Sequence, residues 1–234
     1  MLSPSHAQDP GKHQWGLGAM VATERQAYRD FNDEAKVLPF VLYESRRVRF
    51  VGNTLDLKLP ATDTVSWGVR LRYAGEGYEA EDSPYLLGMA ERKGGFWMGG
   101  SASWRTSWAT LSAELLADVS GNSKGTRMSL GLERSFSSGK FEFTPRIAAH
   151  HVDDKYVNYY YGVRAEEATA SRPYHLGQST TQIEAGLRIG YALAPRHRLS
   201  VDLNATRLGS AIGHSPLVDK SNQRSVRAAY LYLF

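Results

Sequence analysis

The side chains best suited to acid–base or metal chemistry in this sequence are seven histidines: His6, His13, His150, His151, His175, His197 and His214. His150 and His151 are neighbours, and neighbouring residues on a strand point to opposite faces, so these two cannot share a metal ion. No two histidines have the His-x-x-x-His spacing of a metal site. The chain also has no cysteine, which excludes a thiol nucleophile and a cysteine-ligated zinc site. We therefore expect no metal and no cofactor.

One acid–base arrangement stays open at His150, which is followed closely by Asp153 and Asp154. A phospholipase built on a membrane barrel would also need a serine aligned with a histidine on neighbouring strands at the lipid boundary. The apolar faces of this sequence contain no such pair. We interpret the chain as a non-enzyme and keep a hydrolase that depends on His150 as an alternative.

A second set of candidate functional residues consists of charged side chains, which recur at every second position of segments that alternate between apolar and polar residues. Its members are Arg70, Arg72, Glu114, Arg127, Glu133, Glu142, Arg146, Glu184, Arg188 and Asp202. Inside a barrel such charges can pair with one another and stay hydrated, which would make a small interior rigid. The alternative is a narrow channel whose rings of charge select solutes.

The elements that carry these charges are β-strands, because apolar and polar residues alternate with a period of two. In the segment 96–105, Phe96, Met98 and Trp104 fall on one face, and Arg105 falls on the other. The segments 141–150 and 183–193 alternate in the same way. No segment keeps the spacing of an amphipathic helix with comparable regularity, and no apolar run approaches the roughly 20 residues of a membrane helix. The chain is predicted to be all-β.

The connections favour a transmembrane barrel over a sandwich, because short turns and long polar stretches follow each other in turn. The long stretches are 24–36, 75–94, 119–124, 153–180 and 209–223. Outer-membrane barrels have short periplasmic turns and longer outer loops, with charges directed into the lumen. A charge on the lipid side costs about 2–4 kcal/mol for Arg or Lys at the membrane midplane. A soluble barrel with apolar residues inside would reverse this arrangement and expose the apolar face.

The strand count depends on one ambiguous segment, 47–60, in which Gly52-Asn53 is either a hairpin turn or a bulge. Ten strands are expected elsewhere, at 15–23, 37–45, 65–74, 95–105, 108–118, 126–136, 141–151, 182–193, 198–208 and 225–234. A hairpin gives twelve strands in total, and a bent continuation gives ten. We favour a closed antiparallel barrel of twelve strands, with short third and fourth strands.

The two ends of the chain carry different signals. Residues 1–13 resemble the small-residue end of a signal peptide, although a flexible terminus explains them equally well, and residues 14–234 form the predicted barrel domain. The last segment ends on an alternating row made of Val226, Ala228, Tyr230, Tyr232 and Phe234. Such a row resembles the terminal strand that the barrel-assembly machinery recognises, so this machinery and outer-membrane lipid are expected partners.

The net charge of +4 does not indicate a nucleic-acid partner. The 28 Lys and Arg residues are interspersed with 24 Asp and Glu residues, and a basic cluster is what an electrostatic footprint requires. A cluster of tyrosines, Tyr156 and 159–161, lies within a predicted outer loop. We expect it to anchor at the lipid headgroups or to fold the loop onto the rim, with binding of an external ligand as the alternative.

Four motifs resemble the MipA/OmpV family, named for the MltA-interacting protein of Gram-negative outer membranes. The first two are the glycine-rich segment 15–19 and the proline-containing segment 37–43. The third is Tyr159-Tyr160-Tyr161-Gly162-Val163, followed by Glu167-Ala168 and Ser171. The fourth is Ser215-Pro216-Leu217-Val218-Asp219-Lys220. The sequence departs from the family at Arg172-Pro173-Tyr174, where a Gly-Leu usually precedes the loop tyrosine.

The resemblance implies an outer-membrane scaffold that links a murein lytic transglycosylase to a murein synthase. A narrow porin-like channel is the alternative, since other relatives are described as porin-like or adhesive. A murein partner must contact the periplasmic turns, and these turns are short, so the sequence offers little surface for the scaffold role.

Overall fold

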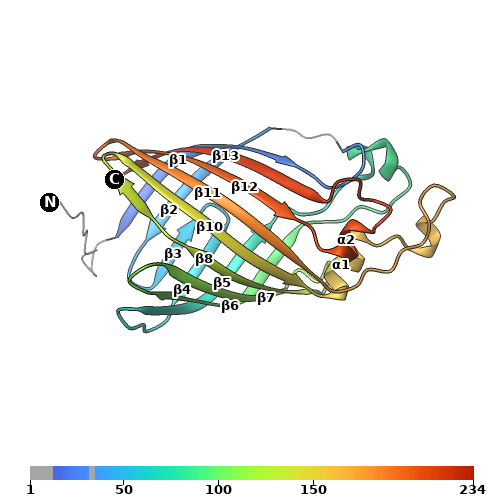
Figure 1. Cartoon of the computed structure of the whole chain (residues 1–234), viewed down its shortest axis with the longest axis horizontal. Helices are drawn as coiled ribbons and strands as arrows, with labels where there is room; N and C mark the ends of the chain where they lie inside the picture. The colour runs from blue at the N-terminus through green and yellow to red at the C-terminus, as the bar shows by residue number, and fades with distance from the viewer. Residues whose placement is uncertain (1–12, 32–34) are drawn as a thin grey trace.

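The computed structural model describes residues 13–31 and 35–234, and it shows a closed antiparallel β-barrel (Figure 1). The strands of the first half are β1 (Gln14–Arg25), β2 (Lys36–Glu44), β3 (Val48–Val51), β4 (Thr54–Lys58), β5 (Val65–Ala74), β6 (Gly95–Arg105) and β7 (Thr110–Asp118). Those of the second half are β8 (Thr126–Glu133), β9 (Phe136–Ser138), β10 (Phe141–Val152), β11 (Thr180–Ala194), β12 (His197–Arg207) and β13 (Asn222–Leu233).

The ring has twelve positions, as predicted. Apart from β9, each strand pairs with the next one around the ring, and β1 pairs with β13 to close the barrel. The short β9 continues β8, because the two pair with successive parts of β10. The ambiguous segment is a hairpin, with Val51 opposite Thr54 and Gly52 at a φ of +60°, a left-handed conformation that favours glycine. The strands β3 and β4 on either side of it are short.

The period of two places apolar side chains outside and charged side chains inside. Trp67 and Trp104 point outward with more than half of their surface exposed, whereas Arg70 and Glu114 are largely shielded. At the closing seam, Gly18 lies opposite Leu231, and a Cβ at Gly18 would overlap the Tyr230 carbonyl group. The alternation thus fixes which face meets lipid, and glycine at the seam lets β1 and β13 approach closely.

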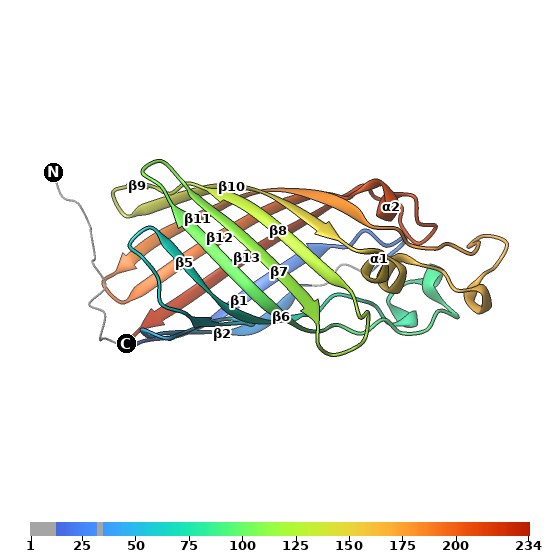
Figure 2. The same cartoon turned by 90° about the horizontal axis from the view of Figure 1, so that it is seen from below.

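The two ends of the barrel differ, and Figure 2 shows them at opposite ends of the long axis. The short connections, at 45–47, 59–64, 106–109, 134–140 and 195–196, lie at the end where β1 starts and β13 finishes, and the fourth of them contains β9. The long connections lie at the other end, together with α1 (Asp154–Tyr161) and α2 (Ser210–Gly213). By the usual orientation of such barrels the turn end is periplasmic and the loop end is outside.

The outer connections contain short helices that the search for a period of two did not anticipate. Besides α1 and α2 they hold three single 3-10 turns, η1 (Ala80–Asp82), η2 (Pro84–Leu86) and η3 (Ala165–Glu167). Asp153 caps α1 by accepting a hydrogen bond from the Tyr156 N–H at 2.9 Å. Within the described part of the chain, no helix is long and apolar enough to cross a membrane.

Candidate functional site

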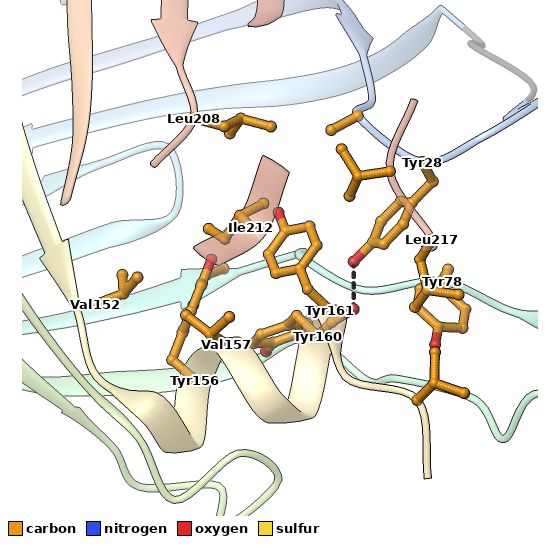
Figure 3. Close-up of a cluster of buried hydrophobic side chains, with 14 of the residues drawn as sticks. Tyr28, Tyr78, Val152, Tyr156, Val157, Tyr160, Tyr161, Leu208, Ile212 and Leu217 are labelled. Carbon is orange, nitrogen blue, oxygen red and sulfur yellow. Dashed lines mark hydrogen bonds between the residues drawn. The ribbon is translucent and has the colours of Figure 1, made fainter. Parts of the chain in front are cut away.

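The outer end of the barrel is filled by an apolar core that we call the plug (Figure 3). It combines strand residues with side chains from four outer connections. Its fully or nearly fully buried members include Ala27, Tyr28, Tyr78, Leu86, Trp97, Leu116, Val152, Tyr156, Val157, Tyr160, Tyr161, Val163, Ile212, Leu217 and Val218. Residues this well packed exclude water from the spaces between their side chains. On this packing we interpret the outer end of the lumen as closed by the loops.

Tyrosines from separate loops meet at the centre of the plug. The Tyr28 hydroxyl donates to the Tyr160 carbonyl oxygen at 3.1 Å, and the Tyr28 ring stacks on Tyr161 with centroids 5.4 Å apart. Tyr78 meets Tyr28 edge-on at 4.9 Å. Burial raises the pKa of Tyr78 to about 12 and also raises the pKa of Tyr28. The tyrosine cluster of the sequence therefore lies inside the plug, and only Tyr159 is half-exposed.

Inside the plug, an ion pair between Arg92 and Glu167 connects the loop between β5 and β6 to the loop between β10 and β11. Nη2 of Arg92 lies 2.8 and 2.9 Å from the two carboxylate oxygens, and the side chains are only 1% and 4% exposed. The remaining Arg92 nitrogens donate to the carbonyl oxygens of Tyr159 and Ala90, both at 2.7 Å. Burial raises the pKa of Glu167, but hydrogen bonds from the Arg164 N–H, from Arg92 and from the Ala90 N–H outweigh it, so this pKa is lowered.

Arg172, where the sequence departs from the family pattern, makes a second connection between the same two loops. Its guanidinium donates to the Glu167 carbonyl oxygen at 3.0 Å and to the Tyr85 carbonyl oxygen at 2.5 Å. The residue is 5% exposed. Sequence reasoning missed both arginines, because their partners are backbone oxygens or lie 75 residues away.

The structure brings the two most specific family motifs into contact. The Ser215 hydroxyl donates to the Tyr161 carbonyl oxygen at 2.6 Å, and the Arg29 N–H donates to the Leu217 carbonyl oxygen at 2.9 Å. Within the motifs, Gly162, Val163, Leu217 and Val218 are buried, Pro216 and Lys220 are half-buried, and Asp219 is exposed. Both motifs therefore belong to the plug.

Below the plug, charged side chains line the lumen in two networks. In the first, Arg70 contacts Asp56 and Glu114, each at 2.6 Å, and Arg72 shares Glu114 at 2.8 Å. These residues come from β4, β5 and β7, and the two arginines of β5 reach across β6 to Glu114 on β7. Asp56, which sequence reasoning did not select, could have been found from the alternation of Leu55-Asp56-Leu57.

The second network lies across β10, β11 and β12. Arg146 contacts Asp202 at 2.6 Å and Glu184 at 3.4 Å, and Arg188 contacts Asp202 at 3.0 Å. Asn204 accepts a further hydrogen bond from Arg146. The strand register places these side chains opposite one another, with Arg188 beside Asp202 and Arg146 beside Gly186.

Three of the predicted lumen charges lie outside these networks. Arg127 sits directly under the plug, 2.8 Å from Glu76, with its guanidinium over the rings of Trp97 and Tyr156. Glu133 and Glu142 are exposed toward the periplasmic end and make no ion pair within residues 13–31 and 35–234. Glu76 belongs to a loop, so nothing in the sequence marked it as a partner of Arg127.

His150 pairs with neither Asp153 nor Asp154. Its Nδ1 lies 2.9 Å from the Ser129 hydroxyl, and its Nε2 lies 3.8 Å from Glu184. A serine hydrolase also needs N–H donors aimed at the substrate oxyanion, and here the backbone of β10 is paired with strands on both sides. We interpret the chain Ser129–His150–Glu184 as part of the polar lining. The described residues contain no group of three or more side chains placed to hold a metal ion.

The terminal row faces outward on β13. Val226, Ala228 and Tyr230 are exposed, and Tyr232 packs edge-on against His197 and Phe234. The row therefore lies on the lipid side of the closing strand. Its predicted role in assembly remains a prediction.

The lumen contains a cavity of about 810 Å³. It runs from Arg46 and Ala61, in the periplasmic turns, up to His150 and to Arg127 under the plug. The cavity, which we call the vestibule, is lined by charged and hydroxyl side chains together with apolar atoms, and it lies between the periplasmic turns and the plug.

Comparisons with known proteins agree with this architecture. A family model described as MltA-interacting protein MipA matches residues 15–234. The chain is 31% identical to outer membrane protein OmpV of Vibrio cholerae over 187 residues, which cover 80% of this chain and 70% of OmpV. It is 25% identical to the MltA-interacting protein of Escherichia coli K12 over 226 residues, covering 94% and 90%.

Among solved structures, an outer membrane channel from Pseudomonas putida F1 aligns over the full length of both chains with a TM-score of 0.50 and 11% identity. That likeness shows the fold alone. The sequence match, the twelve-stranded barrel and the outer-membrane relatives lead to one conclusion: the chain is an outer-membrane β-barrel protein and belongs to the MltA-interacting protein (MipA) family.

Proposed function

We propose that this protein holds a murein lytic transglycosylase at the periplasmic face of the outer membrane and has no catalytic activity of its own. The observation that carries the proposal is the difference between the two ends of the barrel: the plug fills the outer end, whereas the lumen cavity reaches the periplasmic turns. A relative of nearly the same length is named for its interaction with MltA. A murein synthase remains the second predicted partner, as the family resemblance implies.

The periplasmic turns are short, but their charge is one-sided. The turns themselves carry one exposed acid, Asp63, against exposed basic side chains at Arg46, Arg47, Arg134, Lys140 and Arg196, and two further exposed acids, Glu133 and Glu142, lie beside one of the turns. Charge complementarity steers association and fixes orientation more than it adds affinity. A small basic face therefore suits a partner with an acidic surface. Such charge attraction would help a partner to bind even though the short turns offer little contact area.

Site-specific crosslinking tests this docking, because the chain has no cysteine and any introduced cysteine is unique. Ser107→Cys and Ser138→Cys place a crosslinker on two different periplasmic turns, and Ala170→Cys places it on an outer loop. We expect both turn variants, and not Ala170→Cys, to capture the lytic transglycosylase of the same organism. Capture from all three positions, or from none while the barrel is folded, would contradict the proposal.

A narrow solute channel is the second candidate, and the lumen cavity of about 810 Å³ with its charged lining residues favours it. Conduction would require the plug to move, since the plug closes the outer end. In planar bilayers we expect the wild-type protein to show no conductance steps. Discrete steps that shift in Arg70→Ala or Arg146→Ala would put the channel first.

A further inference from the structure

The vestibule carries more positive than negative charge. Arg46, Arg47 and Arg49 line its mouth, and Lys58, Arg70, Arg72 and Arg127 line its wall up to the plug. Among the described residues, two acids, Asp56 and Glu114, line the same space.

Pairing does not remove this surplus. Asp56 and Glu114 are shared by Arg49, Arg70 and Arg72. Two further acids pair with these cations: Glu44 pairs with Lys58 and Arg49, and Glu76 pairs with Arg127. Seven cations therefore face four carboxylates, which leaves three positive charges unbalanced.

The unbalanced charge lies at the mouth. Arg46 and Arg47 are exposed, and their guanidinium groups make no ion pair in the described residues. Both belong to the turn between β2 and β3, at the periplasmic end of the cavity.

The wall also supplies neutral donors. Five serines line the cavity: Ser66, Ser101, Ser103, Ser112 and Ser129. Ser66 and Ser103 bond to each other at 2.8 Å, and Ser129 bonds to His150 at 2.9 Å. The hydroxyls of Ser101 and Ser112 are left as donors for a bound solute. The cations of the lining can bind the acidic groups of a solute, and the serine hydroxyls can bind its polar groups. Such a lining suits an anionic molecule that carries hydroxyl groups.

We propose that the vestibule is a binding site, closed at its outer end, for a small solute with two or more carboxylate or phosphate groups, taken up from the periplasm. Cations that line a cleft with low-dielectric walls focus the field and raise the local concentration of anions. The plug stops such a solute beneath Arg127, so binding takes place without passage. This inference goes beyond the docking role and does not depend on it.

Calorimetric titration of the full chain, refolded in a neutral detergent, tests the site with citrate and glucose 6-phosphate as probes and glucose as the uncharged control. We expect both anions to bind at low salt, the affinity to fall steeply as salt is added, and glucose not to bind. The two probes also distinguish carboxylate from phosphate as the preferred group.

The decisive variant is the double substitution Arg46→Ala with Arg47→Ala, at exposed turn positions that the fold does not need. We expect it to weaken anion binding about tenfold. The matched control, Arg134→Ala with Lys140→Ala, removes the same charge from a turn outside the cavity lining and should leave the affinity unchanged.

Equal losses in the two double variants would show attraction to the surface charge in general and would overturn the site. Absence of anion binding by folded wild-type protein, or equal binding of glucose, would overturn it as well. Faster gel migration before boiling establishes folding for each sample. Crosslinking at Ser107→Cys and Ser138→Cys is measured separately, so failure of this site and failure of the docking role are distinguishable.

Discussion

Ion pairs in the plug, at the outer end of this barrel, are buried, whereas ion pairs in the lumen below it stay in contact with water. In the plug, Arg92 and Glu167 are almost completely buried and packed among aromatic rings. In the lumen, Arg188 is 52% exposed and shares Asp202 with Arg146. Pairs that stay in contact with water contribute little, whereas breaking a buried pair leaves an uncompensated charge. The same residue types thus close one end and merely line the other.

The first prediction has the largest expected effect and tests the buried ion pair of the plug. Arg92→Ala leaves the Glu167 carboxylate buried without its cation, and we expect the plug to lose about 3–5 kcal/mol of stability. Hydrogen exchange of the amides in residues 153–179 measures this loss. Lys93→Ala, which removes an exposed pair with Glu91, should change protection by less than about 1 kcal/mol. Similar losses of protection in the two variants would contradict the conclusion that burial of the Arg92–Glu167 pair causes the effect.

The second prediction compares one apolar side chain in the two surroundings. Leu217 is completely buried in the plug, whereas Leu115 is 61% exposed on the lipid face. Leu217→Ala creates a cavity and should destabilise the plug by about 2–5 kcal/mol, measured by the same amide exchange. Leu115→Ala is the control and should leave plug protection unchanged. Equal exchange in both variants would mean that the outer end is not close-packed.

The third prediction sharpens the comparison from the lumen side. Glu114→Gln removes the charge that Arg70 and Arg72 share, and we expect the barrel to lose about 1.5–3 kcal/mol. Urea unfolding in detergent micelles measures the change. Amide protection in the plug should stay at the wild-type level, and its loss would show that the plug and the lumen are coupled.

The fourth and smallest effect is a pH dependence that belongs to the plug alone. Because the pKa of Glu167 is lowered in the folded protein, its contribution is present above the ordinary carboxyl value of 4.5 and is lost as pH falls through the lower folded pKa. Plug protection should therefore decline below pH 4.5. Glu167→Gln should lose this decline while the acid sensitivity of the lumen persists. An unchanged profile in Glu167→Gln would assign the effect to another group.

The barrel could be predicted from sequence because each strand shows its own alternation. The segments 65–74 and 95–105 coincide with β5 and β6. The switch of phase around Gly52 marked the position of the hairpin, although it also fitted a bulge. Which residues face the lumen follows from the same period. These features are local, and lipid on one side of the wall makes them strict.

The plug could not be predicted in this way, because its contacts join distant segments and its elements are short. Tyr156, Val157, Tyr160 and Tyr161 do have the spacing of one helix face, but the eight residues of α1 are too few for a period to stand out. The partners of Arg92 and Arg172 are fixed only by the folded loops. Sequence reasoning therefore described the wall and the lumen charges but not what closes them.

The plug joins residues that are far apart along the chain, and this determines when it can form. Tyr28 bonds to a residue 132 positions later, and Arg29 bonds to Leu217, which only β13 follows. Contacts between distant segments require that the intervening loops be closed first, and they form late. The outer end can therefore be completed only when the last strand is in place. Resistance of the outer loops to an added protease would mark the moment at which a single molecule has finished assembling.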